Sequence, residues 1–375
     1  MIRNIFITLS LLLLSLNLHT QTISHSTYLV GRALKNTEEI REIDYKQFNY
    51  IYLMAAPEWN HEDFNVSQRE IIDRLVTNHH YATDSSGTAL IPLLITEAGK
   101  NGTKVLISFS GDGFREKVDH LQKRRNLVQM MVAFAEKYNY DGIEIDWEKE
   151  LSIEVHTAFM ADLREQLDII GQKNNKHYIL TTALQSWQIY TPETANKLSN
   201  YVDWINIMTY DLGGGIWGKC ATHNTPFDKI KKELKNWNVF DRKKLCIGFA
   251  NYGFIYKGIQ PDVPVKTNLS EYGAYISYNN ALSLFSKGWT KEYDQKASVY
   301  YYFSPDRNEF VTIENEQTIK SKVEWIVQEK YRGIFWWEFS YDIIKPIDKH
   351  GTVKHHLIDV TGEYLRKNNL QQSSL

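Results

Sequence analysis

The stretch Tyr140-Asp-Gly-Ile-Glu-Ile-Asp-Trp-Glu148 alternates apolar and acidic side chains. Side chains along a β-strand point alternately to two faces, so we expect a strand with Glu144, Asp146 and Glu148 on one face and apolar residues on the other. Three carboxyl groups this close on an otherwise apolar strand repel and desolvate one another, which forces at least one to hold a proton. Acid catalysis requires a proton held beside an ionised partner, so the pattern favours a catalytic site over a hydrated edge strand or an acidic metal site.

The first 22 residues predict a secretory signal. Arg3 provides a positive start, residues 5–18 form a leucine-rich apolar core, and the small Thr20 and Thr22 precede a cleavage point expected near residues 21–23. The apolar run is too short to span a bilayer comfortably, and no later segment is long and apolar enough to do so. We therefore expect a secreted protein without membrane contact after cleavage, located outside the cell or in a periplasm. An uncleaved membrane anchor is the alternative.

The composition narrows the class of protein. A net charge of -2 without a basic stripe argues against nucleic acid as a partner. The 10 Trp, 23 Tyr and 16 Phe supply rings that suit the flat faces of sugars. Cys220 and Cys246 are too few for a disulfide framework, and buried free thiols are favoured over a bridge. No zinc-protease, CxxC or phosphate-loop motif occurs, so neither a metal nor a cofactor is expected.

Strand-like and helix-like runs alternate along most of the chain. Apolar residues at helical spacing, as in residues 127–135, 155–170 and 319–327, separate short apolar runs. This alternation predicts an α/β fold, a parallel (β/α)8 barrel built from residues 23–254 and 304–362. The eight expected strands are residues 28–31, 48–56, 104–108, 140–148, 178–184, 202–211, 245–249 and 333–337.

Two segments depart from this alternation. Residues 255–303 are rich in Tyr and Gly and contain further strand-like runs, which predicts a small α+β insertion after strand seven, at the barrel mouth. Residues 363–375 are polar, so a loose tail is expected there.

Four motifs resemble glycoside hydrolase family 18, the chitinases and their relatives. The acidic stretch beginning at Asp141 resembles the family's DxxDxDxE signature, and Ser108-Phe-Ser-Gly111 is similar to its SxGG motif. Met208-Thr-Tyr-Asp211 resembles the strand-six motif, with Trp217 in the loop after it, and Gly333-Ile-Phe-Trp-Trp-Glu338 resembles the last strand. The likeness covers nearly all of the chain after the signal and implies a (β/α)8 barrel, often with an α+β insertion after strand seven.

The resemblance also implies catalytic roles. Glu148 would be the general acid, Asp146 would orient the N-acetyl group of the substrate, and Tyr210 would hydrogen-bond its carbonyl oxygen. Glu144 would share a proton with Asp146.

For substrate binding, the resemblance implies that Asp211 and Tyr252 line a sugar subsite and that Trp337 stacks beneath it. The matched motifs add Asp141, Trp217 and Ser108 to the expected substrate-binding residues.

The spacing of the acids independently supports this chemistry. Ordinary retaining glycosidases place two carboxyl groups about 5–5.5 Å apart, on opposite sides of the scissile bond. Asp146 and Glu148 lie two residues apart on one strand face, with Cα atoms roughly 6.6 Å apart, so they cannot easily flank one carbon atom. The nucleophile must come from elsewhere, and the 2-acetamido oxygen of N-acetylglucosamine can supply it.

The chain departs from the family pattern at several positions. Glu144 stands where aspartate is usual, and Ser110 replaces the first glycine of SxGG. Ala250-Asn251 replaces a Pro-Phe pair before Tyr252. These changes bear on the shape of the sugar subsites more than on catalysis.

The expected partner is an oligo- or polysaccharide that contains N-acetylglucosamine. The leading hypothesis is a secreted retaining enzyme that cleaves β-1,4 bonds after N-acetylglucosamine, most simply a chitinase. One alternative is an endo-β-N-acetylglucosaminidase that acts on N-linked glycans. Another is a non-catalytic glycan-binding lectin, but such a protein typically lacks the acid that Glu148 provides here.

Overall fold

The computed structural model describes residues 22–33, 35–54, 85–110, 114–213, 215–344 and 353–371. The predicted signal, residues 1–22, therefore falls almost wholly outside the described residues. Across the described ranges, no helix has both the length and the apolar character that a membrane span requires.

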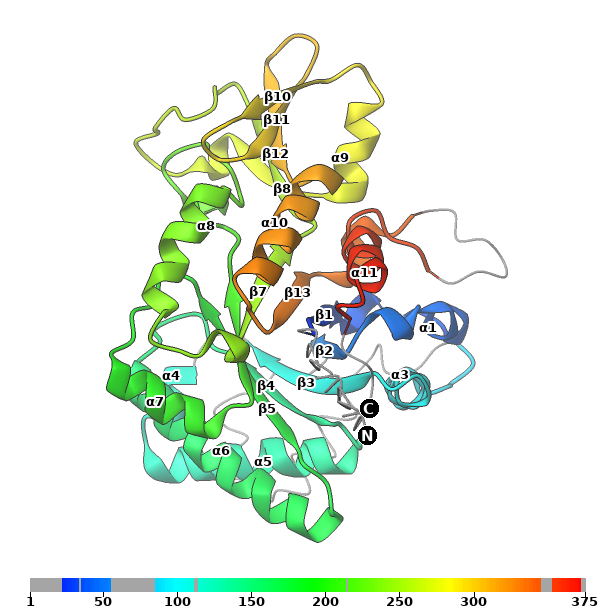
Figure 1. The fold of residues 1–375 in the computed structure, drawn as a ribbon, viewed down its shortest axis with the longest axis vertical. Coiled ribbons are helices and arrows are strands. Elements are labelled where there is room, and N and C mark those ends of the chain that lie inside the picture. The colour runs from blue at the N-terminus through cyan, green and yellow to red at the C-terminus, as the bar shows by residue number, and fades with distance from the viewer. Residues whose placement is uncertain are drawn as a thin grey trace, which may run out of the picture.

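Eight parallel strands close into a barrel, as the alternation of strands and helices predicts (Figure 1). Around the barrel the strands follow the order β1-β13-β7-β6-β5-β4-β3-β2. The strands are β1 Ser24–Val30, β2 Tyr50–Met54, β3 Lys104–Ser110, β4 Gly142–Asp146, β5 Ile179–Gln185, β6 Trp204–Met208, β7 Leu245–Ala250 and β13 Gly333–Trp337.

Helices connect the strands and cover the outside of the barrel (Figure 1). The helices of the described part of the chain, including α9 beside the second sheet, are α1 Thr37–Glu42, α3 Leu90–Lys100, α4 Phe114–Val118, α5 Leu121–Lys137, α6 Ile153–Asn174, α7 Pro192–Tyr201, α8 Phe227–Glu233, α9 Tyr278–Phe285, α10 Glu316–Gln328 and α11 Ile358–Lys367.

Local sequence signals set several helix ends. Thr191 caps α7 with its side chain, and Pro192 occupies the first turn, where no backbone donor is needed. Asn315 caps α10 in the same way. At the other end of α6, Asn175 adopts a left-handed conformation that stops the helix.

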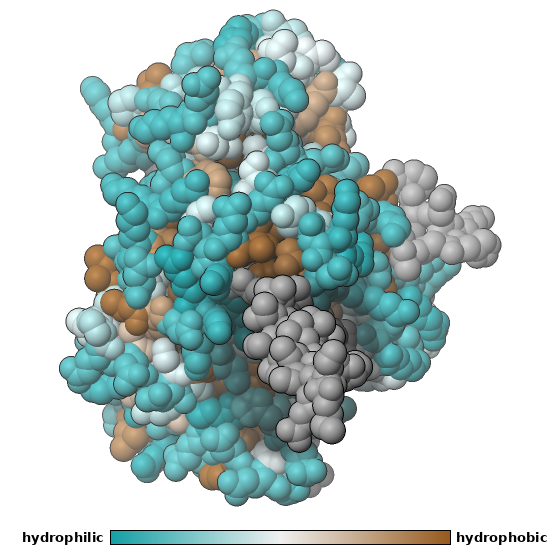
Figure 2. All heavy atoms as spheres, viewed as in Figure 1, coloured by the Kyte–Doolittle hydropathy of each residue, from teal (hydrophilic) through white to brown (hydrophobic). Residues whose placement is uncertain are grey.

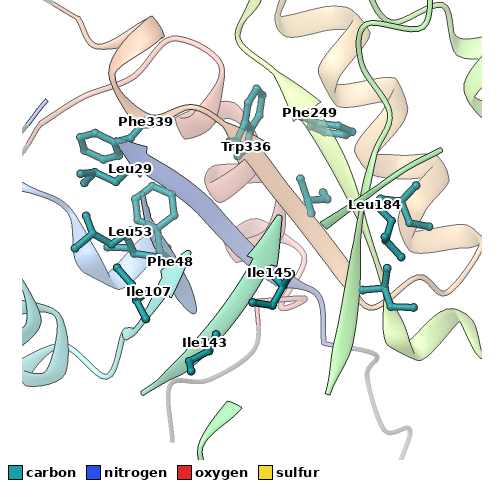
Figure 3. Packing of buried hydrophobic residues seen from close by; sticks show 14 of the residues in the cluster. Leu29, Phe48, Leu53, Ile107, Ile143, Ile145, Leu184, Phe249, Trp336 and Phe339 are labelled. Carbon is teal, nitrogen blue, oxygen red and sulfur yellow. The ribbon is translucent and has the colours of Figure 1, made fainter. Parts of the chain in front are cut away.

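The barrel strands bury both faces. Ile143 and Ile145 point outward into the layer between the strands and the helices (Figure 3), and Trp147 stacks on Phe114 with ring centroids 5.7 Å apart. Trp336 also faces this layer, as its position in the strand predicts, and its indole donates to His25 at 3.1 Å. Gly142 is required where β4 meets β5, because a Cβ there would lie 2.1 Å from the carbonyl oxygen of Ile179.

The apolar side chains are concentrated in these internal layers. On the face drawn in Figure 2 the surface is mostly hydrophilic, and apolar residues form small separate patches.

Both cysteines are free, as expected, but only Cys246 is fully buried; Cys220 is partly exposed.

A second, five-stranded antiparallel sheet follows β7 and stands with α9 at one end of the barrel (Figure 1). Its strands, in the order β10-β11-β12-β8-β9, are β8 Tyr252–Lys257, β9 Gly273–Ser277, β10 Thr290–Asp294, β11 Val299–Phe303 and β12 Glu309–Ile313. The insertion is therefore wider than the predicted 255–303. Residues 304–313, which we assigned to the barrel, instead add β12 between β11 and β8.

The predicted polar tail also differs from the structure. The helix α11 runs to Lys367 and buries Leu365 completely, and Gln371 then pairs with Ile23 beside β1. Burial of one apolar helix face outweighs the polar composition of residues 363–371.

Candidate active site

A cavity of about 550 Å³ opens at the carboxyl ends of the barrel strands, between the barrel and the second sheet. Functional sites of (β/α)8 barrels occur at this end, because the strands there pass into loops that can vary freely. The side chains that line it are those of Tyr28, Asp146, Glu148, Ala183, Met208, Tyr210, Asp211, Tyr252, Tyr275, Ile276, Ser277, Asn280, Trp337 and Tyr341.

The three carboxyl groups of the acidic stretch lie at increasing depth in the barrel. Glu148 is exposed at the mouth, Asp146 is 5% exposed, and Glu144 is completely buried. The strand β4 ends at Asp146, so Glu148 stands just beyond the strand rather than within it as predicted. The Gln185 side chain fixes the backbone just after β4 by donating to the Glu148 carbonyl oxygen at 2.8 Å.

Two hydroxyl groups hold Glu144 inside the barrel. Tyr28 donates to one of its carboxyl oxygens at 2.6 Å, and Ser108 donates to the other at 2.5 Å. Burial raises the pKa of Glu144 from 4.5 to about 7, and the two hydrogen bonds partly counteract this rise. The carboxyl group can therefore gain or lose a proton near neutral pH.

Asp146 lies between Glu144 and Glu148. Burial, followed by the charges of Glu148 and then Glu144, raises its pKa well above the ordinary value. Its Oδ1 atom is buried without a hydrogen-bond partner among the described atoms, and the residue lines the cavity. Asp146 thus presents to the cavity a carboxyl group that holds a proton more tightly than an ordinary aspartate does, next to the exposed Glu148.

A second polar group faces the cavity from the carboxyl end of β6. Tyr252 donates its hydroxyl hydrogen to Asp211 at 2.8 Å, and Asn224 accepts from the Asp211 backbone N–H at 2.6 Å. Burial raises the pKa of Asp211 to about 6. Burial also raises the pKa of Tyr210, so its hydroxyl group keeps its proton and can donate to a ligand.

The ring of Trp337 lines the cavity from the end of β13. Its centroid lies 5.4 Å from that of Tyr28, which lines the cavity from β1. An indole face beside hydroxyl and carboxyl groups suits a sugar ring, whose two faces are apolar and whose rim is polar. No group of three or more His, Cys, Asp or Glu in the described ranges is arranged to hold a metal ion, and independence from metals stays a prediction.

Six of the ten predicted site residues line this cavity, whereas Asp141, Ser108, Trp217 and Glu144 do not. Asp141 precedes β4 at the opposite end of the barrel, where it accepts from the Val105 backbone N–H at 2.9 Å, so it is not a substrate contact. Ser108 is buried against Glu144, and Asp146 above them lines the cavity instead. Trp217 lies outside the cavity and is 69% exposed.

Several residues that line the cavity could not be predicted from the sequence. Tyr28 lies on a predicted strand, and only the closed barrel shows that it faces Glu144. Tyr275 comes from β9 of the second sheet, Asn280 from α9 and Tyr341 from the segment after β13. Nothing in the local sequence distinguishes them from other surface aromatic or amide residues.

Comparisons with known proteins agree with this architecture. The model of the family described as Glycosyl hydrolases family 18 matches residues 77–342. Chitinase A1 of Niallia circulans is 26% identical over 289 residues, which cover 65% of this chain and 41% of that protein. Probable chitinase 2 of Drosophila melanogaster is 25% identical over 254 residues, or 58% of this chain and 51% of that protein. The chain therefore spans about half the length of these relatives or less.

Solved structures show the same fold. An immunomodulatory active chitinase from Trichuris suis superposes with a TM-score of 0.72 at 20% identity, over 92% of this chain and all of that one. A family 18 chitinase from Cycas revoluta in complex with (GlcNAc)3 superposes with a TM-score of 0.68 at 17% identity, over 91% of this chain and 99% of that one.

Proposed function

Because the chain belongs to the glycosyl hydrolases of family 18, we propose that it hydrolyses the β-1,4 bond after N-acetylglucosamine in chitin or chito-oligosaccharides. The relatives named above are chitinases, and one solved relative holds a trimer of N-acetylglucosamine. The cavity combines an aromatic floor at Trp337 with carboxyl and hydroxyl groups around it, which suits such a sugar.

The observation that carries the proposal is the graded burial of three carboxyl groups, those of Glu144 and Asp146 on β4 and that of Glu148 just beyond the strand. Glu148 at the mouth can reach a glycosidic oxygen, and it is the general acid in this proposal. Burial and the acidic neighbours raise the pKa of Asp146 below it, which favours a protonated carboxyl group that can donate to or accept from the acetamido group of the sugar. Glu144 beneath, with a pKa of about 7, can exchange a proton with Asp146 as charge develops.

The proposed reaction proceeds in two steps. Glu148 protonates the glycosidic oxygen while the acetamide carbonyl oxygen attacks C1, which breaks the C1–O bond and forms an oxazolinium ion. Tyr210 donates to the acetamide oxygen and Asp146 holds the acetamide N–H during this step. Water activated by the ionised Glu148 then attacks C1, reopens the ring and returns the proton, with net retention of configuration.

Hydrolysis of chito-oligosaccharides by Glu148→Gln and by the control Glu150→Gln tests the assignment. Glu150 is an exposed glutamate on the same loop, outside the cavity. We expect Glu148→Gln to lower kcat by about 10²–10⁴-fold while binding persists, and Glu150→Gln to behave as the parent. Undiminished turnover by Glu148→Gln would show that another group is the acid.

The product identifies the nucleophile and the substrate. Proton NMR of the first product should show the β-anomer, and a thiazoline analogue of the oxazolinium ion should inhibit strongly. An inverted product would exclude the acetamide mechanism. A high-mannose glycopeptide assayed in parallel distinguishes a chitinase from an enzyme that cuts N-linked glycans.

The cellular location is a separate proposal. Arg3 and the apolar residues 5–18 support export through a cleaved signal. Mass spectrometry of the protein recovered from the expressing cells and from their medium should find a mature chain that begins near residues 21–23. An intact amino terminus on cell-associated protein would favour a retained anchor.

A further inference from the structure

Asn251 is the single residue between the barrel strand β7 and the first strand of the second sheet, β8, and it is completely buried. A buried amide needs hydrogen-bond partners, so the partners of this residue show which elements it holds together.

Asn251 holds the segment that carries the floor of the cavity. Its side-chain nitrogen donates to the carbonyl oxygen of Glu338 at 2.7 Å and to the carboxylate of Asp342 at 2.9 Å. Its backbone N–H donates to the carbonyl oxygen of Trp337 at 3.2 Å. The segment fixed in this way includes Trp337 and Tyr341, both of which line the cavity.

The same residue also holds the opposite wall. The carbonyl oxygen of Asn251 accepts from the backbone N–H of Tyr278 at 3.0 Å, at the start of α9. The neighbouring residues Ser277 and Asn280 line the cavity. Asn251 therefore connects the aromatic floor, which belongs to the barrel, with the wall that the second sheet supplies.

The acceptor Asp342 is itself fixed by a third element. Its carboxylate pairs with the Nδ1 atom of His355 at 2.9 Å and accepts from the backbone N–H groups of Leu357 and Ile358 at 2.8 and 3.0 Å. Asp342 and the His355 side chain are completely buried. Because the start of α11 anchors Asp342, this partner of Asn251 cannot shift without disturbing the helix.

We propose that Asn251 is a positioning residue that sets the distance between Trp337 and the Ser277–Asn280 wall, and thereby the affinity for a chain of N-acetylglucosamine. This inference rests on the function proposed above. A binding site held about 1 Å too loosely loses much of its affinity and rate, so a single buried amide can govern both.

The test replaces the amide by a carboxyl group of the same shape, Asn251→Asp, in the Glu148→Gln protein so that the ligand stays intact. The ionisable group facing this position is Asp342, with His355 behind it, and Glu338 contributes its backbone oxygen. At about pH 5 the new carboxyl group supplies at most one hydrogen where the amide supplies two, so one of the bonds to Glu338 and Asp342 is lost. At about pH 9 the ionised group supplies none and faces the Asp342 carboxylate, which repels it.

Calorimetric titration with the N-acetylglucosamine trimer supplies the readout. Relative to its parent at each pH, Asn251→Asp should bind about two- to tenfold more weakly at about pH 5, where one bond is lost, and more weakly still at about pH 9, where both are lost. Circular dichroism must show a folded protein at both values. If that variant does not fold, Asn251→Ala should show about tenfold weaker binding at both values.

Thr103→Val is the matched control for a general loss of stability. The Thr103 hydroxyl is buried at the opposite end of the barrel and donates to the carbonyl oxygens of Tyr45 and Phe48 at 2.7 and 2.8 Å. We expect this variant to unfold at a lower temperature without weaker trimer binding. Parent-like binding by the Asn251 variants, or equal weakening by Thr103→Val, overturns the inference. Failure of the Glu148→Gln parent to bind the trimer would instead count against the proposed function.

Discussion

At the scale of single residues, Glu144 shows how the acid site costs stability. Its carboxyl group is buried, and its pKa is raised from 4.5 to about 7, so the folded state binds this proton more tightly than the unfolded state does. Its contribution to stability is therefore most favourable below about pH 4.5 and declines as the pH rises to about 7, by about 3 kcal/mol in total.

Glu144→Gln removes that titration and keeps the size of the side chain. We expect thermal unfolding of the parent to shift downward by several degrees between pH 4.5 and pH 7.5, and the shift to be clearly smaller in the variant. The exposed substitution Glu165→Gln is the control and should leave the pH dependence of the parent unchanged. An equally steep decline in Glu144→Gln would mean that Glu144 is already ionised below this range.

The sequence predicts which acids share a face, but not how deep each one lies. The alternation of side chains correctly places Glu144 and Asp146 on the inner face of β4, whereas Glu148 lies two residues beyond the end of the strand. Depth depends on how neighbouring strands are staggered, so Glu144 ends below the cavity and Asp141 lies beyond the opposite end of the barrel. A motif match carries no information about this stagger.

At the scale of elements, the loop after β6 is held against the second sheet. Its 3-10 helix η4, Gly215–Trp217, packs against the second sheet, where a Cβ on Gly215 would come within 3.0 Å of the Tyr275 hydroxyl. The backbone N–H of Leu269 also donates to the carbonyl oxygen of Gly218 at 3.1 Å. Trp217 is thus presented by a fixed element although its ring is 69% exposed.

An exposed ring outside the cavity can contact only sugars that project from it. Trp217→Ala should therefore leave kcat/KM for short chito-oligosaccharides unchanged and lower it about 2- to 10-fold for longer ones, since one aromatic contact is worth about 0.5–1.5 kcal/mol. The control is Tyr293→Ala, a half-exposed ring on β10, at the sheet edge opposite the β9 wall. Equal losses for short and long substrates would contradict this role.

At the scale of the whole molecule, the barrel could be predicted from the sequence and the junction with the second sheet could not. Eight buried runs separated by helical periodicity leave few alternatives to a parallel barrel. The strand β12 could not be predicted, because a short run such as residues 309–313 contains no local sequence signal that assigns it to one sheet or the other. Its partner β8 lies about fifty residues earlier in the chain.

That junction contains a buried ion pair. Lys322 on α10 contacts Glu314, which follows β12, and donates to the Thr225 carbonyl oxygen at 2.7 Å; both charged side chains are 2% exposed. The hydroxyl groups of Thr225 and Thr318 donate to the Glu314 carboxyl group. Burial lowers the pKa of Lys322, whereas the charge of Glu314 counteracts that effect. The pair therefore holds the second sheet against the barrel only while both partners are present.

Lys322→Met should lower the free energy of unfolding by about 3–5 kcal/mol, because it leaves the Glu314 carboxyl group buried without its cation. Adding Glu314→Gln removes the unpaired buried charge but keeps an acceptor for Thr225 and Thr318. The double variant should therefore recover more than half of the lost free energy of unfolding. Urea unfolding measures both, and the exposed Lys320→Met on the same helix is the control for losing a lysine from α10. If the double variant is no more stable than the single one, the loss comes from packing of the lysine stem rather than from the uncompensated charge.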